Sequence, residues 1–211
     1  HTGLPIRPEI LAASREAGLK KLNLEASDFH ILVVGGSRGA QSLNRSLIQV
    51  YRQIGRTKGL HWIHVTGEKG YNEYRKELLE AGIDLSENGN ITLIPYLHGM
   101  ENALAVSDLV IGRAGASFLA EILARGIPSI LIPYPFAAEN HQEYNARAVS
   151  NQGAAIMVLE KDLTGELLVK LVQELLQDRE RLRAMSARAL DLGKPEALDQ
   201  LVGLALDMLG L

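Results

Sequence analysis

Short runs of β-branched and other aliphatic residues alternate along most of this 211-residue chain with longer stretches whose apolar residues recur at helical spacing. The first run, at residues 30–34, reads HILVV and is followed by two glycines. Strands that alternate with helices of about 10–15 residues indicate βαβ units and a parallel sheet. Because the runs are continuously apolar and βαβ crossovers are right-handed, the sequence predicts an α/β domain. In it, helices cover both faces of a doubly wound parallel sheet.

The alternation gives a set of expected elements within one expected domain. Strands are expected at residues 30–34, 60–65, 91–94, 109–111, 129–132 and 154–159. Helices are expected at residues 40–54, 72–81, 100–106, 118–125, 141–151, 164–177, 178–192 and 195–209. No repeat or low-complexity segment divides them, so residues 11–211 are interpreted as one domain. Residues 1–10 read as the tail of a linker, and we expect the chain to be a fragment of a longer protein.

Composition and charge exclude several partners and chemistries. The net charge is −3 with acids and bases mixed along the chain, which argues against nucleic acid as the main partner. The absence of cysteine excludes disulfides, thiolate catalysis and cysteine-ligated metals. The six histidines are scattered, and His61 and His64 lie at an odd separation on one expected strand, so no metal site is predicted. No apolar run approaches the roughly 20 residues that a membrane-spanning helix needs.

The first glycine-rich turn, Gly35 to Ala40, lies between an expected strand and an expected helix. In open α/β sheets, ligands bind at the carboxyl ends of the strands. Glycine lets the backbone approach a ligand, and the free N–H groups at the start of a helix favour an anion. The Ser37 hydroxyl and the Arg38 charge would add to such a site. A tight turn without a ligand is the alternative interpretation.

A second glycine-rich turn, Gly112 to Ser117, also follows an apolar run and precedes an expected helix. Two such turns in one parallel sheet suggest a ligand with two separable parts. Glu121 lies one helical turn beyond Ser117, where its carboxylate can accept hydrogen bonds from the cis-diol of a ribose. A solvated glutamate on a helix surface is the alternative interpretation.

The third candidate feature is the segment Pro133 to Ala146, which follows the expected strand at 129–132. Its prolines keep the chain extended before a helix begins near residue 140. Gln142 and Asn145 are three positions apart and would share one face of that helix. Amide side chains both donate and accept hydrogen bonds and so suit sugar hydroxyls. Ordinary polarity of a helix surface is the alternative.

Two other classes of protein fit parts of the pattern. The G-x-S-x-G motif at residues 35–39 matches the nucleophile elbow of α/β-hydrolases, with Ser37 as the nucleophile. Asp108 and His141 follow in the chain order of a catalytic triad, but no HGG-type segment lies upstream. A NAD-binding Rossmann domain is the other alternative, with Glu68 as the acidic ribose ligand. Its fingerprint is imperfect because the glycines run G-G-x-x-G, and it leaves the second turn unexplained.

Four motifs occur here in the order found in one family: TGLPIRPEI, ILVVGGSRGAQSLN, GRAGASFLAEI and PYPFAAENHQEYNA. Over essentially its whole length the chain resembles the C-terminal half of the MurG-type UDP-N-acetylglucosamine transferases. These enzymes convert lipid I to lipid II in bacterial peptidoglycan synthesis. The resemblance implies a GT-B architecture, in which two Rossmann-like domains enclose the active site. This chain would be the donor-binding domain, with residues 195–211 forming a helix that returns towards the absent N-terminal domain.

The resemblance also implies roles for individual residues towards the donor, UDP-N-acetylglucosamine. Arg7 would contact the donor, and the turn at Ser37 would hold the diphosphate. The backbone of Leu97 would read the uracil edge, and Gln142 would bind the hydroxyls of the N-acetylglucosamine ring. One run of residues would cover the phosphates and the ribose, and its last member, Glu121, would bind the ribose hydroxyls. The run consists of Ala116, Ser117, Phe118, Leu119, Ala120 and Glu121.

Two positions depart from the pattern of the family. Phe118 stands where some relatives carry a threonine, so a hydroxyl that can bond a phosphate is missing. Arg38 replaces a common glutamine, which adds positive charge near the expected diphosphate.

The reaction that the resemblance implies is an inverting transfer, in which the 4-hydroxyl of the lipid I muramyl sugar attacks the donor and UDP leaves. No essential metal or other cofactor is expected. The acceptor site, the catalytic base and the surface that docks peripherally on the cytoplasmic face of the inner membrane would lie in the absent half. The chain alone is therefore expected to bind donor without turnover, and a non-catalytic nucleotide-binding module is the alternative.

Overall fold

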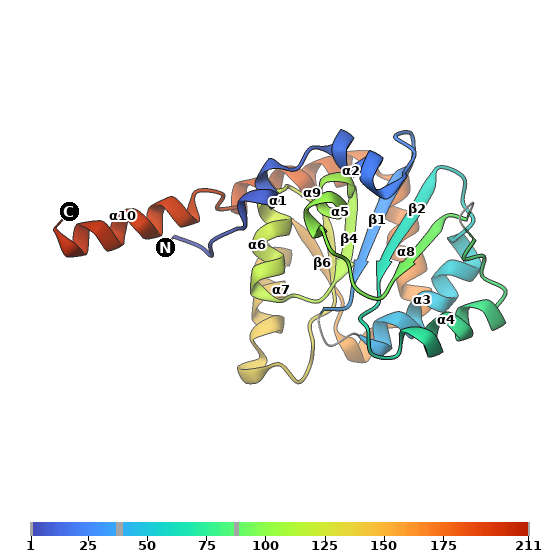
Figure 1. The fold of residues 1–211 in the computed structure, drawn as a ribbon. Coiled ribbons are helices and arrows are strands. Elements are labelled where there is room, and N and C mark those ends of the chain that lie inside the picture. The colour runs from blue at the N-terminus through green and yellow to red at the C-terminus, as the bar shows by residue number, and fades with distance from the viewer. Residues whose placement is uncertain (1, 37–39, 87–88, 211) are drawn as a thin grey trace.

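The computed structural model describes residues 2–36, 40–86 and 89–210, which form an α/β domain with helices on both faces of a parallel sheet (Figure 1). Within these residues the sheet has six strands in the order β3-β2-β1-β4-β5-β6, and every neighbouring pair is parallel. The strands are β1 (Phe29–Val34), β2 (Leu60–Val65), β3 (Ile91–Ile94), β4 (Leu109–Gly112), β5 (Ser129–Leu131) and β6 (Ala155–Met157). The predicted doubly wound parallel sheet is confirmed.

The strand order places a topological switch point between β1 and β4. The chain moves outward from β1 through β2 to β3 and then returns to start β4 on the other side of β1. The loops that leave the carboxyl ends of β1 and β4 therefore run to opposite faces and leave a crevice between them. Both glycine-rich turns are these two loops, since β1 ends at Val34 and β4 ends at Gly112.

Helices pack on both faces because alternate residues of each strand point to opposite sides. Ile31 and Val33 of β1 belong to one apolar cluster, whereas Leu32 and Val34 belong to another. The α-helices are α1 (Pro8–Ala12), α2 (Arg15–Leu22), α3 (Gln41–Ile54), α4 (Tyr71–Glu80), α5 (Met100–Val106), α6 (Ala116–Ala124), α7 (His141–Asn151), α8 (Gly165–Gln177), α9 (Arg179–Leu192) and α10 (Ala197–Leu209). Two short 3₁₀ helices are η1 (Ala138–Asn140) and η2 (Glu160–Asp162).

Some elements differ from the sequence-based expectation. Helices α1 and α2 were not predicted, because each is short and α2 is only weakly amphipathic. They are held by tertiary contacts: Ile10 of α1 is fully buried, and α2 packs on α5. Helix α6 begins at Ala116 rather than 118, so Ala116 and Ser117 form its first turn. Strand β6 is shorter than the expected run at 154–159.

Helix α10 projects away from the rest of the domain (Figure 1). Its large apolar side chains are exposed: Leu198, Leu201, Val202, Leu204, Leu206, Met208 and Leu209. Only Ala197, at its start, is buried. Among the described residues, no helix is both long enough and apolar enough to cross a bilayer.

Asp108 joins the amino ends of the two central strands. Its Oδ2 accepts hydrogen bonds from the backbone N–H of His30 at 2.8 Å and from the Arg15 guanidinium at 3.1 Å. Burial raises the pKa of Asp108, but the hydrogen bonds from His30 and Arg15 outweigh it and hold that pKa below its ordinary value. His141, in contrast, begins α7, beyond the carboxyl end of β5. The two residues lie at opposite ends of the sheet, so the triad considered for a hydrolase does not form.

Replacing Asp108 by asparagine should lower the free energy of unfolding by about 2 kcal/mol at pH 7, because charge-assisted hydrogen bonds to His30 and Arg15 are lost. A carboxylate whose folded pKa is depressed stabilises the fold above its unfolded pKa of about 3.9. The difference between the two proteins should therefore shrink as the pH falls below about 4. Urea unfolding measured from pH 3 to 7 checks this.

The control for this substitution is Asp191→Asn, which removes a carboxylate that is 70% exposed and pairs with Arg188 on the surface of α9. It should change the free energy of unfolding by less than about 0.5 kcal/mol. A difference for Asp108→Asn that did not vary with pH would contradict the role assigned to its charge.

Candidate functional site

The turn after β1 combines a special backbone conformation with a strand contact. The N–H of Gly35 donates to the carbonyl of Val65 at 3.3 Å, which continues the β1–β2 pairing by one residue. Gly36 has φ of 84°, in the left-handed region that favours glycine, and a Cβ there would meet nothing within 4 Å. Glycine is needed here for conformation rather than for space. Ser37 and Arg38 lie outside the described residues, so the role of Ser37 stays a prediction.

The turn after β4 needs its first glycine for space. A Cβ on Gly112 would lie 2.8 Å from the carbonyl oxygen of Val34 and 3.4 Å from Cε1 of Phe118. The next residue, Arg113, donates its N–H to the same Val34 oxygen at 3.3 Å. The two glycine-rich turns are therefore joined directly by backbone at the switch point.

The first turn of α6 leaves backbone donors free at this crevice. Gly115 is extended, with φ −67° and ψ 138°, and no side chain caps the helix. The carbonyl of Gly115 accepts the N–H of Leu119, whereas the N–H groups of Ala116, Ser117 and Phe118 meet no acceptor among the described residues. Unpaired N–H groups at the N-terminus of a helix carry a partial positive charge, so this turn can bind an anionic oxygen.

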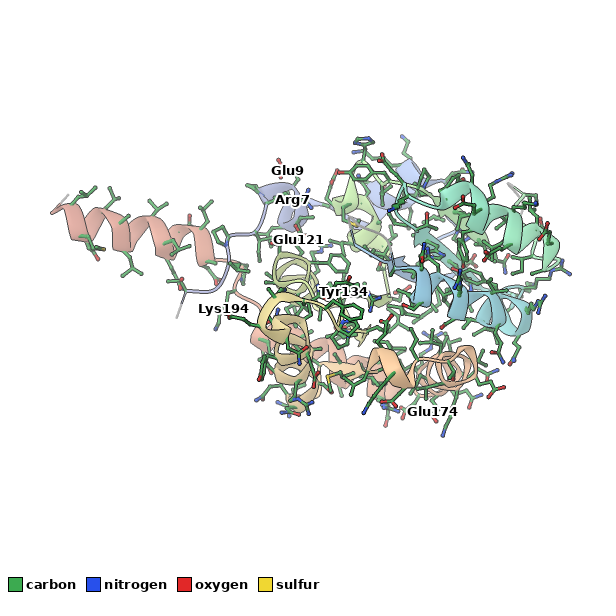
Figure 2. The ribbon with its side chains drawn as sticks, turned by 90° about the horizontal axis from the view of Figure 1, so that it is seen from below. Arg7, Glu9, Glu121, Tyr134, Glu174 and Lys194 are labelled. Atoms are coloured by element: carbon green, nitrogen blue, oxygen red, sulfur yellow. The ribbon has the colours of Figure 1, made fainter. Side chains whose placement is uncertain are left out.

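Two predicted site residues that are 114 positions apart meet beside this turn (Figure 2). Nε and Nη2 of Arg7 each lie 3.0 Å from Oε1 of Glu121. Glu121 is 8% exposed, whereas the side chain of Arg7 is 57% exposed. The second oxygen of the Glu121 carboxylate, Oε2, has no partner among the described residues. The arginine thus holds one carboxylate oxygen and leaves the other able to accept a hydrogen bond.

The two amides on α7 have different partners. Oε1 of Gln142 accepts the backbone N–H of Tyr134 at 3.0 Å, which leaves the Gln142 NH₂ group to donate elsewhere. Asn145 donates to the carbonyl of Ala114 at 3.2 Å and so ties α7 to the β4–α6 turn. Before α7, Glu139 and Asn140 both adopt left-handed φ values, 50° and 56°. Such strain in residues other than glycine is concentrated at functional loops.

The remaining predicted residues fall into two groups. Leu97 follows β3, and neither its N–H nor its C=O is bonded to another described residue, so its backbone can be read by a ligand. Its side chain and that of Phe118 pack in the same apolar cluster. Leu119 and Ala120 line an apolar groove of about 720 Å³, and Ala120 also packs against the cluster that contains Leu97 and Phe118. The same groove is lined near the N-terminus by Thr2, Gly3, Leu4 and Ile6.

The histidines do not gather into a metal site. His61 bonds to Oγ1 of Thr92 at 2.8 Å. His64 is fully buried between the Tyr51 hydroxyl and Oδ1 of Asn44, and this burial lowers its pKa to about 3. Across residues 2–36, 40–86 and 89–210, no three His, Asp or Glu side chains are close enough together to hold an ion. That the protein needs no metal stays a prediction.

Sequence reasoning assigned no role to three residues at the carboxyl end of the sheet. Arg113 is buried and hydrogen-bonded to Glu160 and Ser42, which come from two other loops. The one sequence signal for this cluster was the presence of an arginine inside a glycine-rich turn. Glu160 could not be linked to it, because it lies 47 positions away in a stretch without a motif.

Comparison with known proteins settles the family. Residues 30–201 match the model of the glycosyltransferase family 28 C-terminal domain. The chain belongs to this family. Family 28 membership also removes support from the NAD-binding alternative and, together with the separation of Asp108 from His141, from the hydrolase alternative.

Relatives of this family 28 domain bear out the resemblance to MurG-type enzymes. A protein of Moorella thermoacetica named UDP-N-acetylglucosamine–N-acetylmuramyl-(pentapeptide) pyrophosphoryl-undecaprenol N-acetylglucosamine transferase is 49% identical over 201 residues, 95% of this chain and 54% of the relative. A protein of the same name from Halothermothrix orenii is 48% identical over 206 residues, 98% of this chain and 56% of the relative. The chain thus spans about half the length of the curated relatives that it matches.

A solved structure agrees with this assignment. The crystal structure of Acinetobacter baumannii MurG superposes with a TM-score of 0.75 and 28% identity, covering 92% of this chain and 54% of that protein. The GT-B fold expected for this half is therefore confirmed.

Alanine substitutions at two glycines of the turn after β4 should have different effects on the free energy of unfolding. Gly112→Ala forces a Cβ against the Val34 carbonyl, so it should lower the free energy of unfolding by about 1–3 kcal/mol. Gly115→Ala meets nothing within 4 Å at an ordinary φ, so its effect should be within about 0.5 kcal/mol. Urea unfolding of both variants makes the comparison, and equal losses would contradict the close approach of β4 to β1.

Proposed function

We propose that this chain is the donor-binding half of an N-acetylglucosaminyltransferase and binds UDP-N-acetylglucosamine in the crevice between the β1–α3 and β4–α6 turns. The observation that carries the proposal is the switch point itself: both glycine-rich turns leave the sheet there, and the helix that follows the second turn carries Glu121. Ligands of open α/β sheets bind at such points. Family 28 membership and the names of the relatives support the choice of ligand.

The diphosphate would bind to the backbone of the two turns. The N–H groups of Ala116, Ser117 and Phe118 would supply donors without side-chain charge, and the predicted donors of the turn at Ser37 would join them. Because negative charge grows on the leaving diphosphate during transfer, donors fixed in advance would stabilise the transition state more than the ground state. Leu119 and Ala120 would border the donor site without donating to the diphosphate, since the Leu119 N–H is bonded to Gly115 and both side chains line the neighbouring groove.

The remaining parts of the donor have one candidate partner each. Oε2 of Glu121 would accept hydrogen bonds from the ribose hydroxyls, while Arg7 orients the carboxylate and contacts the donor. The free backbone of Leu97 would pair with the uracil edge. The NH₂ group of Gln142 would donate to a hydroxyl of the N-acetylglucosamine ring.

The whole reaction would need the half that lies outside this chain. In the intact protein, the 4-hydroxyl of the lipid I muramyl sugar would attack the donor with inversion, giving lipid II and UDP. The acceptor site and the catalytic base would belong to the N-terminal domain, which would dock peripherally on the cytoplasmic face of the membrane. The exposed leucines of α10 suit packing against that domain. The present chain alone would bind the donor without turning it over and without a cofactor.

Replacing Glu121 by glutamine should weaken UDP binding about tenfold, because hydrogen bonds to a carboxylate contribute roughly 1.5–3 kcal/mol. The unsubstituted chain should bind UDP-N-acetylglucosamine and UDP, should prefer UDP to 2′-deoxy-UDP, and should not bind NAD. Glu121→Gln should lose most of the preference for UDP over the deoxy nucleotide. Isothermal titration calorimetry with the four ligands measures each quantity.

Glu9→Gln is the matched control, because Glu9 is an exposed glutamate on α1 close in sequence to Arg7 (Figure 2). It should leave the affinities for UDP and for 2′-deoxy-UDP unchanged within twofold. If Glu121→Gln still preferred UDP to 2′-deoxy-UDP as strongly as the unsubstituted chain, the carboxylate would not read the ribose. Binding of NAD in place of UDP would overturn the proposed function as a whole.

A further inference from the structure

A closed ring of hydrogen bonds connects three loops at the carboxyl end of the sheet. Arg113, from the turn after β4, donates through Nη1 to Oε2 of Glu160 in η2, which follows β6. The hydroxyl of Ser42, in the first turn of α3, donates to the other oxygen of Glu160. Nη2 of Arg113 donates to Oγ of Ser42 at 3.2 Å, which closes the ring. Loops that follow β1, β4 and β6 are thereby fixed to one another.

The charges in this ring are matched and largely enclosed. The side chain of Arg113 is 9% exposed and that of Glu160 is 24% exposed. Burial raises the pKa of Glu160, but the hydrogen bonds from Arg113 and Ser42 outweigh it and hold that pKa below its ordinary value, so the carboxylate is ionised at neutral pH. Arg113 is thus neutralised by Glu160 and is already bonded on both terminal nitrogens.

The same guanidinium also fixes the loop that follows β5. Nη1 of Arg113 donates to the carbonyls of Ile132 at 3.1 Å and Pro133 at 3.3 Å. The guanidinium carbon lies 5.5 Å from the centre of the Tyr134 ring, within the range of a cation–π contact. The N–H of Tyr134 in turn donates to Oε1 of Gln142. Arg113 therefore connects the segments that follow β1 and β4 with Gln142, whose amide is proposed to bind the sugar.

We propose that Arg113, Glu160 and Ser42 are positioning residues for the sugar nucleotide. They set the spacing of the loops after β1, β4 and β5, which bind the nucleotide, without touching it themselves. This inference rests on the proposed function. If Glu160 lost its charge, Arg113 would become an uncompensated cation in a buried site, which is costly. The guanidinium would then turn towards solvent. This movement would release the first turn of α3 and the loop after β5 from their present places.

Glu160→Gln tests this directly, because it keeps the size of the side chain and removes its charge. Titration of the chain with UDP-N-acetylglucosamine should show a Kd raised about tenfold, equivalent to about 1.4 kcal/mol. The stoichiometry should stay that of the unsubstituted chain, because the domain remains folded. The stoichiometry separates the two kinds of effect: unfolded protein lowers the number of sites, whereas displaced loops raise the Kd of every site.

Substitutions of Ser42 give a second test that leaves the ion pair in place. Ser42→Ala removes the bridging hydroxyl, which is bonded to two charged groups, and should raise the Kd roughly fivefold, equivalent to about 1 kcal/mol. Ser42→Thr keeps the hydroxyl and should restore the original Kd. Glu174→Gln is the matched control, since Glu174 pairs with Lys170 and Arg181 on the surface of α8, far from these loops (Figure 2). It should leave the Kd unchanged within twofold.

Three results would overturn the inference. An unchanged Kd for Glu160→Gln, with or without a reduced stoichiometry, would make the ring purely structural. Tighter binding of UDP, with no change for uridine, would make Arg113 a phosphate ligand rather than a positioning residue. If the unsubstituted chain did not bind UDP-N-acetylglucosamine at all, this inference and the proposed function would both fail, whereas the first two results leave the proposed function standing.

Discussion

The close approach of β4 to β1 is the constraint on which the rest of the site depends. A side chain at Gly112 would collide with the carbonyl of Val34, so only glycine lets the two strands end side by side at the point where the strand order reverses. That contact brings two separate turns to one crevice. The turn after β1 supplies a left-handed glycine, and the turn after β4 supplies the uncapped start of α6. The uncapped start of α6 can therefore bind an anion at this crevice, and we propose that the turn after β1 joins it.

Electrostatics in this crevice depend on which charges are already paired. Arg113, a buried cation within the second turn, is neutralised by Glu160 and connects loops. Arg7 pairs with Glu121 but its side chain remains more than half exposed, so among the described residues it can still reach a ligand. The site thus separates a buried cation that holds the loops in place from an exposed one, and in the proposed complex the N–H groups at the start of α6 would bind the diphosphate.

The sequence predicted those features that depend on local pattern. Continuous apolar runs identified the parallel strands, and glycines between a strand and a helix identified both turns, because these signals need no knowledge of distant residues. Helix α2 was missed because it is short and weakly amphipathic and depends on packing against α5. The pairing of Arg113 with Glu160 was missed because their contact depends on the order of β4, β5 and β6 in the sheet. The contact between Arg7 and Glu121 likewise required the fold.

A crystal structure of the chain with bound UDP-N-acetylglucosamine tests the central claim most directly. We expect diphosphate oxygens within hydrogen-bonding distance of the N–H groups at residues 116–118 and of the turn after β1, with the ribose hydroxyls on Glu121. Arg113 should remain bonded to Glu160 and should not contact the ligand. A nucleotide seated elsewhere, for example in the apolar groove beside residues 2–6, would contradict the account.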